Sequence, residues 1–253
     1  NMILHGIDTP TNIKHDNTLS RPYKDYGNAD RVHVIITNPP FGGMEEDGIE
    51  NNFPAHLRTR ETADLFMALI IKLLKDGGRA AVVLPDGFLF GEGMKTRLKQ
   101  SLLEECNLHT IVRLPNGVFN PYTGIKTNLL FFTKGKPTEH VWYYEHPYPE
   151  GVKSYNKTKP MRFEEFQTEI NWWGHEADGF AARVQTEQAW KVLVADIVAR
   201  NYNLDIKNPH VGEQVSHDPD ELLQQYQQQQ NAITGLRNQL KNILQQALHR
   251  GGA

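Results

Sequence analysis

Alternating strand and helix patterns along residues 32–144 constrain the fold of this chain more than any other feature. Two segments, 63–74 and 95–106, carry apolar residues at helical spacing, and Gly77-Gly78 is expected to end the first helix. Short apolar and β-branched runs around these helices predict five strands: 32–37, 79–84, 110–114, 128–133 and 140–144. This alternation predicts an α/β domain with a mostly parallel sheet whose apolar strands are buried on both faces.

Composition narrows the class of protein. The chain has 253 residues with 39% hydrophobic and 23% charged residues, which is ordinary for a globular protein. Its net charge of -3 provides no overall positive field, so a nucleic acid would have to meet a local basic patch. Cys106 is the only cysteine, which excludes intrachain disulfides and a cysteine-built zinc site and indicates a cytoplasmic protein. The longest apolar stretch, residues 65–74, is too short to cross a membrane.

Three regions are expected. Residues 1–146 form the α/β domain, and residues 147–215, which are rich in aromatic side chains, wrap and pack against it. Residues 216–253 form a glutamine-rich helix with a heptad seam, in which Gln229 is the one polar member. The apolar members of the seam are Leu222, Tyr226, Ile233, Leu236, Leu240, Ile243 and Ala247.

Asn38-Pro39-Pro40-Phe41 directly follows the predicted strand 32–37. Ligands of open α/β sheets bind outside the carboxyl ends of strands, so these residues are well placed for a site. The two prolines fix the backbone, so the Asn38 side chain and the Pro39 carbonyl can both accept hydrogen bonds from one planar amino group. Phe41 adds a flat surface on which a ring can stack. The pattern predicts a pocket for an exocyclic amine such as N6 of adenine, although Asn-Pro-Pro is also a common loop sequence.

Such a pocket favours transfer of a methyl group. The lone pair of an adenine amine is delocalised into the ring, and two acceptors on its hydrogens favour a more tetrahedral nitrogen whose lone pair can attack an electrophilic methyl group. Positioning and electrostatics then provide most of the rate. A base inside a duplex would have to be flipped out to reach the pocket.

The sequence from residue 1 to about 210 resembles the modification subunits of type I restriction–modification systems, which are adenine-N6 DNA methyltransferases. Segment 37–42, Thr-Asn-Pro-Pro-Phe-Gly, resembles the family's catalytic motif. The other segments that carry the resemblance are 1–7, 16–19, 77–90, 108–115, 126–132 and 202–209.

The resemblance implies a Rossmann-like methyltransferase sheet and S-adenosylmethionine as the methyl donor. It implies that Asn38, Pro39, Pro40 and Phe41 align the target adenine and that Asp16 lies near the adenine of the cofactor. It also points to Phe119 and Tyr122 as residues that hold the flipped base, with packing inside a loop as the alternative.

One departure from the family concerns the cofactor. The family binds it through a glycine-rich loop after the first strand, and no such loop precedes Asn38. We therefore expect the sheet to be incomplete at its N-terminal side. The chain is expected to be the C-terminal part of a longer subunit and to be inactive when isolated. The alternatives are a catalytically silent assembly module and a methyltransferase of the same fold that acts on RNA or protein.

The resemblance also implies partners: DNA, a specificity subunit, a second modification subunit and a restriction subunit. The heptad helix is expected to contact the specificity subunit, although docking on its own domain is the alternative.

The histidines show no metal-binding spacing, so no metal is expected. Cys106 is expected to be a buried hydrophobic residue, and Trp172-Trp173 is expected to pack rather than to stack bases. The basic cluster Lys153, Lys157, Lys159 and Arg162 can contact phosphates or simply be solvated.

Overall fold

The computed structural model describes residues 3–6 and 15–210, together with the helical residues 226–227, 230–231, 233–238 and 240–241. The chain divides into two compact units, residues 1–210 and residues 211–253. Among the described residues, none of the helices has both the length and the apolar character needed to span a membrane.

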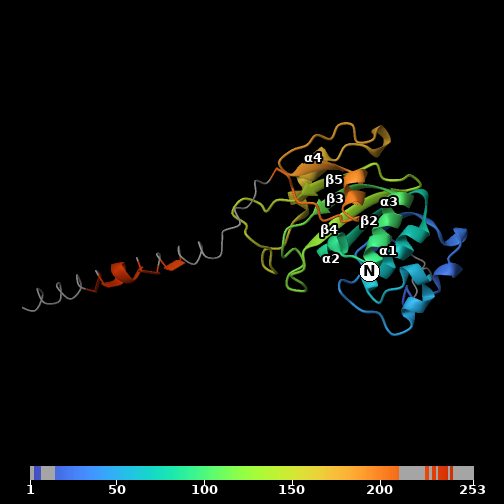
Figure 1. The fold of residues 1–253 in the computed structure, drawn as a ribbon, viewed down its shortest axis with the longest axis horizontal. Helices are drawn as coiled ribbons and strands as arrows, with labels where there is room; N and C mark the ends of the chain where they lie inside the picture. The colour runs from blue at the N-terminus through green and yellow to red at the C-terminus, as the bar shows by residue number, and fades with distance from the viewer. Residues whose placement is uncertain are drawn as a thin grey trace, which may run out of the picture. The chain divides into compact units, whose positions relative to one another are not determined.

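The first unit is built on one mixed six-stranded sheet (Figure 1). Its strands follow the order β1 (Val32–Thr37), β2 (Leu74–Pro85), β4 (Thr127–Lys134), β3 (Cys106–Arg113), β5 (His140–Glu145) and β6 (Ala189–Leu193). Two pairs are parallel, β1 with β2 and β3 with β5, and the other three are antiparallel. The prediction of a mostly parallel sheet is therefore wrong, because β4 follows β3 through a loop, without the crossover helix that a parallel pair requires.

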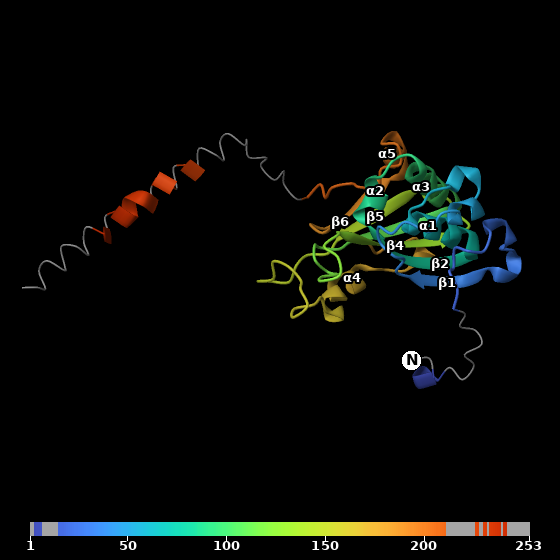
Figure 2. The same ribbon diagram turned by 90° about the horizontal axis from the view of Figure 1, so that it is seen from below.

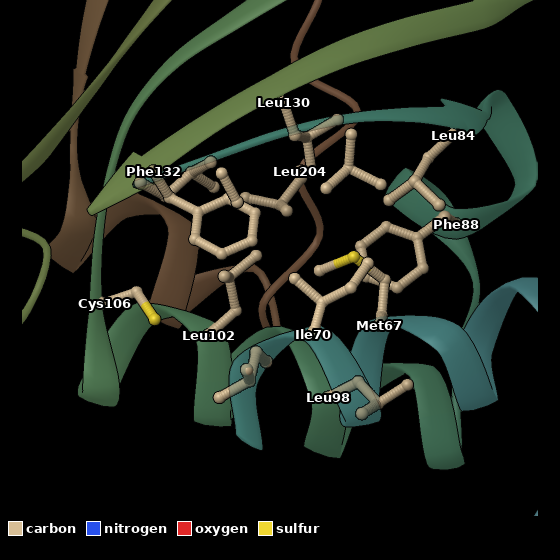
Figure 3. Close-up of a cluster of buried hydrophobic side chains, with 14 of the residues drawn as sticks. Met67, Ile70, Leu84, Phe88, Leu98, Leu102, Cys106, Leu130, Phe132 and Leu204 are labelled. Carbon is tan, nitrogen blue, oxygen red and sulfur yellow. The ribbon is translucent and has the colours of Figure 1, made fainter. Parts of the chain in front are cut away.

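Helices α1 (Thr62–Leu73), α2 (Asp86–Phe90) and α3 (Met94–Glu105) cover one face of this sheet (Figure 2). Figure 3 shows Met67 and Ile70 of α1 and Leu102 of α3 turned toward side chains of the sheet, with Leu98 of α3 beside the two helices. All four are buried, and the helical spacing predicted this for Ile70, Leu98 and Leu102.

The end of α1 differs from the prediction. The helix stops at Leu73 and the chain enters β2 at once, so Gly77 and Gly78 lie inside the strand rather than at a helix end. Pairing of β1 with β2 shifts register between Val32 and Val34, and this irregularity accommodates the glycine pair.

Residues 147–215 were expected to wrap around the α/β unit, and they also contribute β6 and two helices, α4 (Gln167–Trp172) and α5 (Val194–Ala199). Helix α4 lies on the other side of the sheet from α1 to α3 (Figure 2). Trp172 packs on Trp142 with 5.4 Å between ring centroids, and Trp173 packs on Phe131 at 4.7 Å. The prediction that these tryptophans pack is confirmed.

Short 3-10 helices complete the described elements: Ile3–His5, Tyr23–Asp25, Asn28–Asp30, Ile49–Asn52, Ala55–Leu57, Phe163–Phe166 and Glu176–Asp178.

The second unit is described only in part. Tyr226, Ile233, Leu236 and Leu240 of the predicted seam are helical, and all four are exposed. The other members, Leu222, Gln229, Ile243 and Ala247, lie outside the described residues.

Candidate target-base site

The carboxyl ends of β1 and β2 meet at one edge of the sheet because the two strands are parallel, with Thr37 beside Val82. Asn38 therefore leaves the sheet at the same edge as Asp86. Strand β3 also ends at this edge with Arg113, which is paired with Asn128 near the start of β4. The loop between these two strands, residues 114–126, thus begins and ends at the edge where Asn38 lies.

Burial alternates along the Asn38–Phe41 segment. Pro39 is buried, Asn38 and Pro40 are exposed, and Phe41 is partly buried. The buried proline fixes the backbone, while the Asn38 side chain stays accessible to a ligand.

The chain just after Phe41 is held against the start of α1. The backbone N–H and the Oγ1 hydroxyl of Thr62 both donate to the Gly43 carbonyl oxygen at 3.0 Å. A Cβ atom at Gly43 would lie 3.2 Å from Thr62 Oγ1, so a side chain here would push the segment away from the helix. Glycine at 43 therefore keeps the pocket backbone close to α1.

Phe119 contacts Phe41, and Tyr122 lies exposed on the same loop. The rings of Phe41 and Phe119 meet edge to face with 5.5 Å between centroids and 80° between planes. Tyr122 is 92% exposed. The loop 114–126 thus provides one aromatic wall next to Asn38, and an open position for Tyr122.

Two contacts tether the loop 114–126 to the segment that follows β5. Asn120 Nδ2 donates to the Tyr155 carbonyl oxygen at 3.1 Å, and Tyr148 OH donates to the Asn116 carbonyl oxygen at 2.8 Å. Tyr148 and Tyr155 were not predicted as part of the site. Since they lie about 30 residues away from the loop in sequence, no local pattern connects them with it.

Asp16 lies on an exposed turn. Its Oδ1 accepts a hydrogen bond from Ser20 Oγ at 3.3 Å, and Asn17 Nδ2 reaches Glu45 Oε2 at 3.1 Å, which brings this turn close to the chain after Phe41. One exposed carboxylate does not make a pocket for a nucleoside cofactor. Within the described ranges no glycine-rich loop follows a strand ahead of Asn38. The described residues therefore provide only Asp16 for the cofactor, at the edge of its expected site, and do not form a complete binding site.

We assign structural roles to the other potentially reactive side chains. Cys106 is fully buried, and burial raises the pKa of its thiol to about 12, so it is not a nucleophile. His5, His15, His33 and His56 are exposed. In the part of the chain that the structure describes, no group of three His, Cys, Asp or Glu residues is arranged to hold a metal ion. Lys153, Lys157, Lys159 and Arg162 are all exposed.

An open hollow lies on the sheet face away from α1 and α3. This open pocket of about 450 Å³ is lined by Val34, Ile36, Phe131, His109 and Trp173, among others. Val34 is 52% and Ile36 is 81% exposed, which is unusual for apolar side chains of a sheet. The face of β1 that borders this pocket is thus left uncovered by the described residues.

The chain carries Asn-Pro-Pro-Phe at the carboxyl end of a strand of an α/β sheet, and the family model for N-6 DNA methylases matches residues 1–218. The chain belongs to this family. In particular, it is 70% identical over 248 residues to the methylase subunit of the type I restriction enzyme EcoEI of Escherichia coli. The match covers 98% of this chain and 50% of that subunit. It is also 33% identical to the EcoKI methylase subunit of Escherichia coli K12, over 80% of this chain and 39% of that subunit.

Solved structures agree with the fold. A modification subunit attributed to a type I restriction enzyme of Vibrio vulnificus superposes with a TM-score of 0.75 and 45% identity, over 85% of this chain and 46% of that one. The EcoKI M protein superposes with a TM-score of 0.69 and 30% identity, over 81% and 49%. The fold is therefore that of type I modification subunits. The chain spans half or less of the length of these relatives.

Proposed function

We propose that this chain forms the target-base part of a type I modification subunit that methylates N6 of adenine in DNA, with S-adenosylmethionine as the methyl donor. The observation that carries the proposal is the placement of Asn38. Its side chain is exposed at the carboxyl edge of the sheet, next to an aromatic wall made by Phe41 and Phe119. The relatives are subunits of restriction enzymes, which favours DNA over RNA or protein as the substrate.

In this proposal the chain binds and orients the base. The amide oxygen of Asn38 and the carbonyl oxygen of Pro39 each accept one N–H of the adenine amine. Two acceptors fixed on the same nitrogen favour the geometry in which its lone pair points away from the ring plane. Phe41 stacks on the base, and its edge-to-face contact with Phe119 holds the stacking ring in place. The base reaches the pocket by rotating out of the duplex.

The methyl donor binds mostly outside the described residues. Asp16, on the turn that contacts Glu45, is the group of this chain that we place at the margin of the donor site. The donor supplies an electrophilic methyl group when it is bound. Because the described residues lack a complete donor site, we infer that the isolated chain is inactive.

Partners are part of the proposal. The exposed Tyr226, Ile233, Leu236 and Leu240 form an apolar stripe on a helix with few charges, which suits a partner helix better than solvent. We assign this stripe to the specificity subunit, and DNA sequence reading to the same partner. We further include a second modification subunit and a restriction subunit in the cytoplasmic complex.

The test is methyl transfer by a complete modification complex that contains Asn38→Ala or Phe41→Ala. Loss of the amide oxygen removes one of two acceptors on the reacting nitrogen, so the Asn38→Ala rate should fall at least about a hundredfold. Assembly of the complex, measured by size-exclusion chromatography, should be unchanged. The matched control is Asn51→Ala, at an exposed asparagine that has no assigned role. Full activity of both pocket variants would refute the assignment.

A further inference from the structure

The segment 201–208, which lies about 160 residues after Asn38, crosses the ends of several sheet elements near the site. Leu204 is fully buried, and Figure 3 shows its side chain among Leu84, Phe88 and Leu130. Its backbone N–H donates to the Leu89 carbonyl oxygen at 3.0 Å, and its carbonyl oxygen accepts from Tyr143 OH at 3.0 Å. The segment is therefore docked on the core rather than on the surface.

Asp205, the next residue, forms an ion pair with a buried arginine at the carboxyl edge of the sheet. Arg113 is 6% exposed, and its Nη2 lies 2.6 Å from Asp205 Oδ1 and 3.5 Å from Asp86 Oδ1. Its Nη1 donates to the Ile206 carbonyl oxygen at 3.1 Å. Asp86 in turn accepts a hydrogen bond from Asn128 Nδ2 at 2.9 Å. Asp205 thus provides the closest carboxylate for Arg113.

This network lies at the base of the loop 114–126. Arg113 immediately precedes the loop, and Asn128 follows it by two residues. The two ends of the loop are joined where Leu114 N–H donates to the Thr127 carbonyl oxygen at 3.0 Å, and Asp86 N–H donates to the Lys126 carbonyl oxygen at 2.9 Å. The same loop carries Phe119, whose ring contacts Phe41. A change at Asp205 can therefore reach the pocket through Arg113 and the loop base.

This network contains polar groups and backbone conformations that are energetically unfavourable and that packing of the core does not require. Four polar atoms of this network are buried without hydrogen-bond partners, although each such group usually destabilises a fold: Arg113 Nε, Thr127 Oγ1, Asn128 Oδ1 and Asp205 Oδ1. The contact of Asp205 with Arg113 is therefore an ion pair without hydrogen-bond geometry. Asn201 and Tyr202 both adopt left-handed backbone conformations, with φ of 56° and 58°, which is strained for tyrosine. Strain and unsatisfied polar groups persist where the surrounding structure imposes a particular geometry, and they are enriched at functional sites.

We propose that Asp205 is a positioning residue for the target-base pocket: through Arg113 it holds the base of the loop 114–126, and so keeps Phe119 against Phe41. The proposal rests on the assignment of Asn38 and Phe41 to the target adenine. It predicts that the segment 201–208 affects the handling of the base without contacting base or methyl donor.

The experiment compares Asp205→Asn with the wild type in a complete modification complex. Removing the carboxylate charge leaves Arg113 with Asp86 at 3.5 Å, so the guanidinium should shift toward Asp86 and loosen the loop base. Hydrogen–deuterium exchange of residues 114–126 should become faster, while exchange of α1 and α3 stays the same. The kcat for methyl transfer should fall at least about tenfold, because small displacements of aligned groups have large effects on rate. The KM for S-adenosylmethionine should not change. Asp205→Glu, which keeps the charge, should retain more activity than Asp205→Asn.

Asp196→Asn is the matched control, since Asp196 is an exposed carboxylate of the neighbouring α5. Unchanged loop exchange in Asp205→Asn, or faster exchange with an unchanged kcat, would overturn the proposal. An increase in the KM for the methyl donor would also count against it. Asn38→Ala in the same assay separates the two hypotheses: if it stays active, the proposed function fails, whereas the exchange measurement still decides whether Asp205 holds the loop.

Discussion

Arg183 and His109 show how single buried residues tie the segment after β5 to the sheet. The Arg183 guanidinium lies 3.7 Å from the ring centroid of Phe180, and its Nη1 donates to Thr110 Oγ1 at 2.8 Å. Burial lowers the pKa of Arg183 to about 9, which is still high enough for the group to be charged at neutral pH. His109 is also buried, with its Nδ1 2.7 Å from Thr110 Oγ1. A charged guanidinium and a neutral imidazole therefore share one apolar, aromatic environment.

This arrangement predicts acid sensitivity at His109. Burial, and then the nearby Arg183, lower the pKa of His109 from 6.5 to about 3 in the folded protein. The stabilising contribution of neutral His109 is fully present above pH 6.5 and is lost progressively as the pH falls from 6.5 toward 3. At pH 5 the loss should be about 2 kcal/mol of unfolding free energy. Urea unfolding of wild type and His109→Gln at pH 7 and pH 5 measures it.

The difference in unfolding free energy between the two pH values should be smaller in His109→Gln, because glutamine does not titrate. His33→Gln serves as the control, since His33 is an exposed histidine. An identical pH dependence in all three proteins would mean that His109 is accessible to protons in the folded state.

At the scale of helices and strands, the spacing of apolar residues predicted those elements whose formation depends on local sequence. Strand β1 and helix α3 are close to the predicted bounds because their apolar patterns are long and regular. Strand β6 was missed, since it has only five residues, one of them Lys191, and becomes a strand by pairing with β5 about fifty residues earlier. Gly77-Gly78 was misassigned because pairing of Leu74 with Val32 starts the strand before the glycines.

The candidate site likewise contains residues that could be predicted from local sequence and residues that could not. The placement of Asn38 to Phe41 directly after a strand could be predicted, because the apolar run 32–37 and the two prolines that end it are adjacent in sequence. The Arg113, Asp86 and Asp205 network could not, because its members are 119 residues apart at the extremes and no local pattern joins them. The family resemblance pointed to Phe119 as a residue that holds the flipped base, but its contact with Phe41 was not predicted.

The exposed helical stripe gives a prediction at this scale. Ile233→Lys with Leu236→Lys places two charges in the seam, so binding to the specificity subunit should weaken at least about a hundredfold. Pull-down or calorimetry with the purified specificity subunit measures the change. The control is Asn238→Lys, which adds a charge on the opposite face of the helix. Equal binding by the seam variant and the control would exclude this stripe as the contact.

For the molecule as a whole, the uncovered face of β1 and the marginal position of Asp16 lead to one prediction about the methyl donor. Val34 and Ile36 are exposed beside an open pocket, so the described residues leave apolar sheet surface in water. In the proposed function, Asp16 is the one group of this chain assigned to the methyl donor, so the described residues do not form a complete donor site. The EcoEI subunit, which is 70% identical and of which this chain covers 50%, is the natural comparison.

Calorimetry with S-adenosylmethionine should therefore show binding to the EcoEI subunit and none to residues 1–253 alone. Asn38→Ala transferred to the matching position of the longer protein should leave donor binding intact, because Asn38 is assigned to the base. Asp16→Ala at its matching position should weaken donor binding only modestly, by less than about tenfold, because an exposed carboxylate contributes one hydrogen bond.

Binding by residues 1–253 with an affinity like that of the longer subunit would mean that the donor site lies within this chain. The uncovered face of β1 and the open pocket beside it would then be the first place to search for that site, since the carboxyl edge is already occupied by the groups assigned to the base.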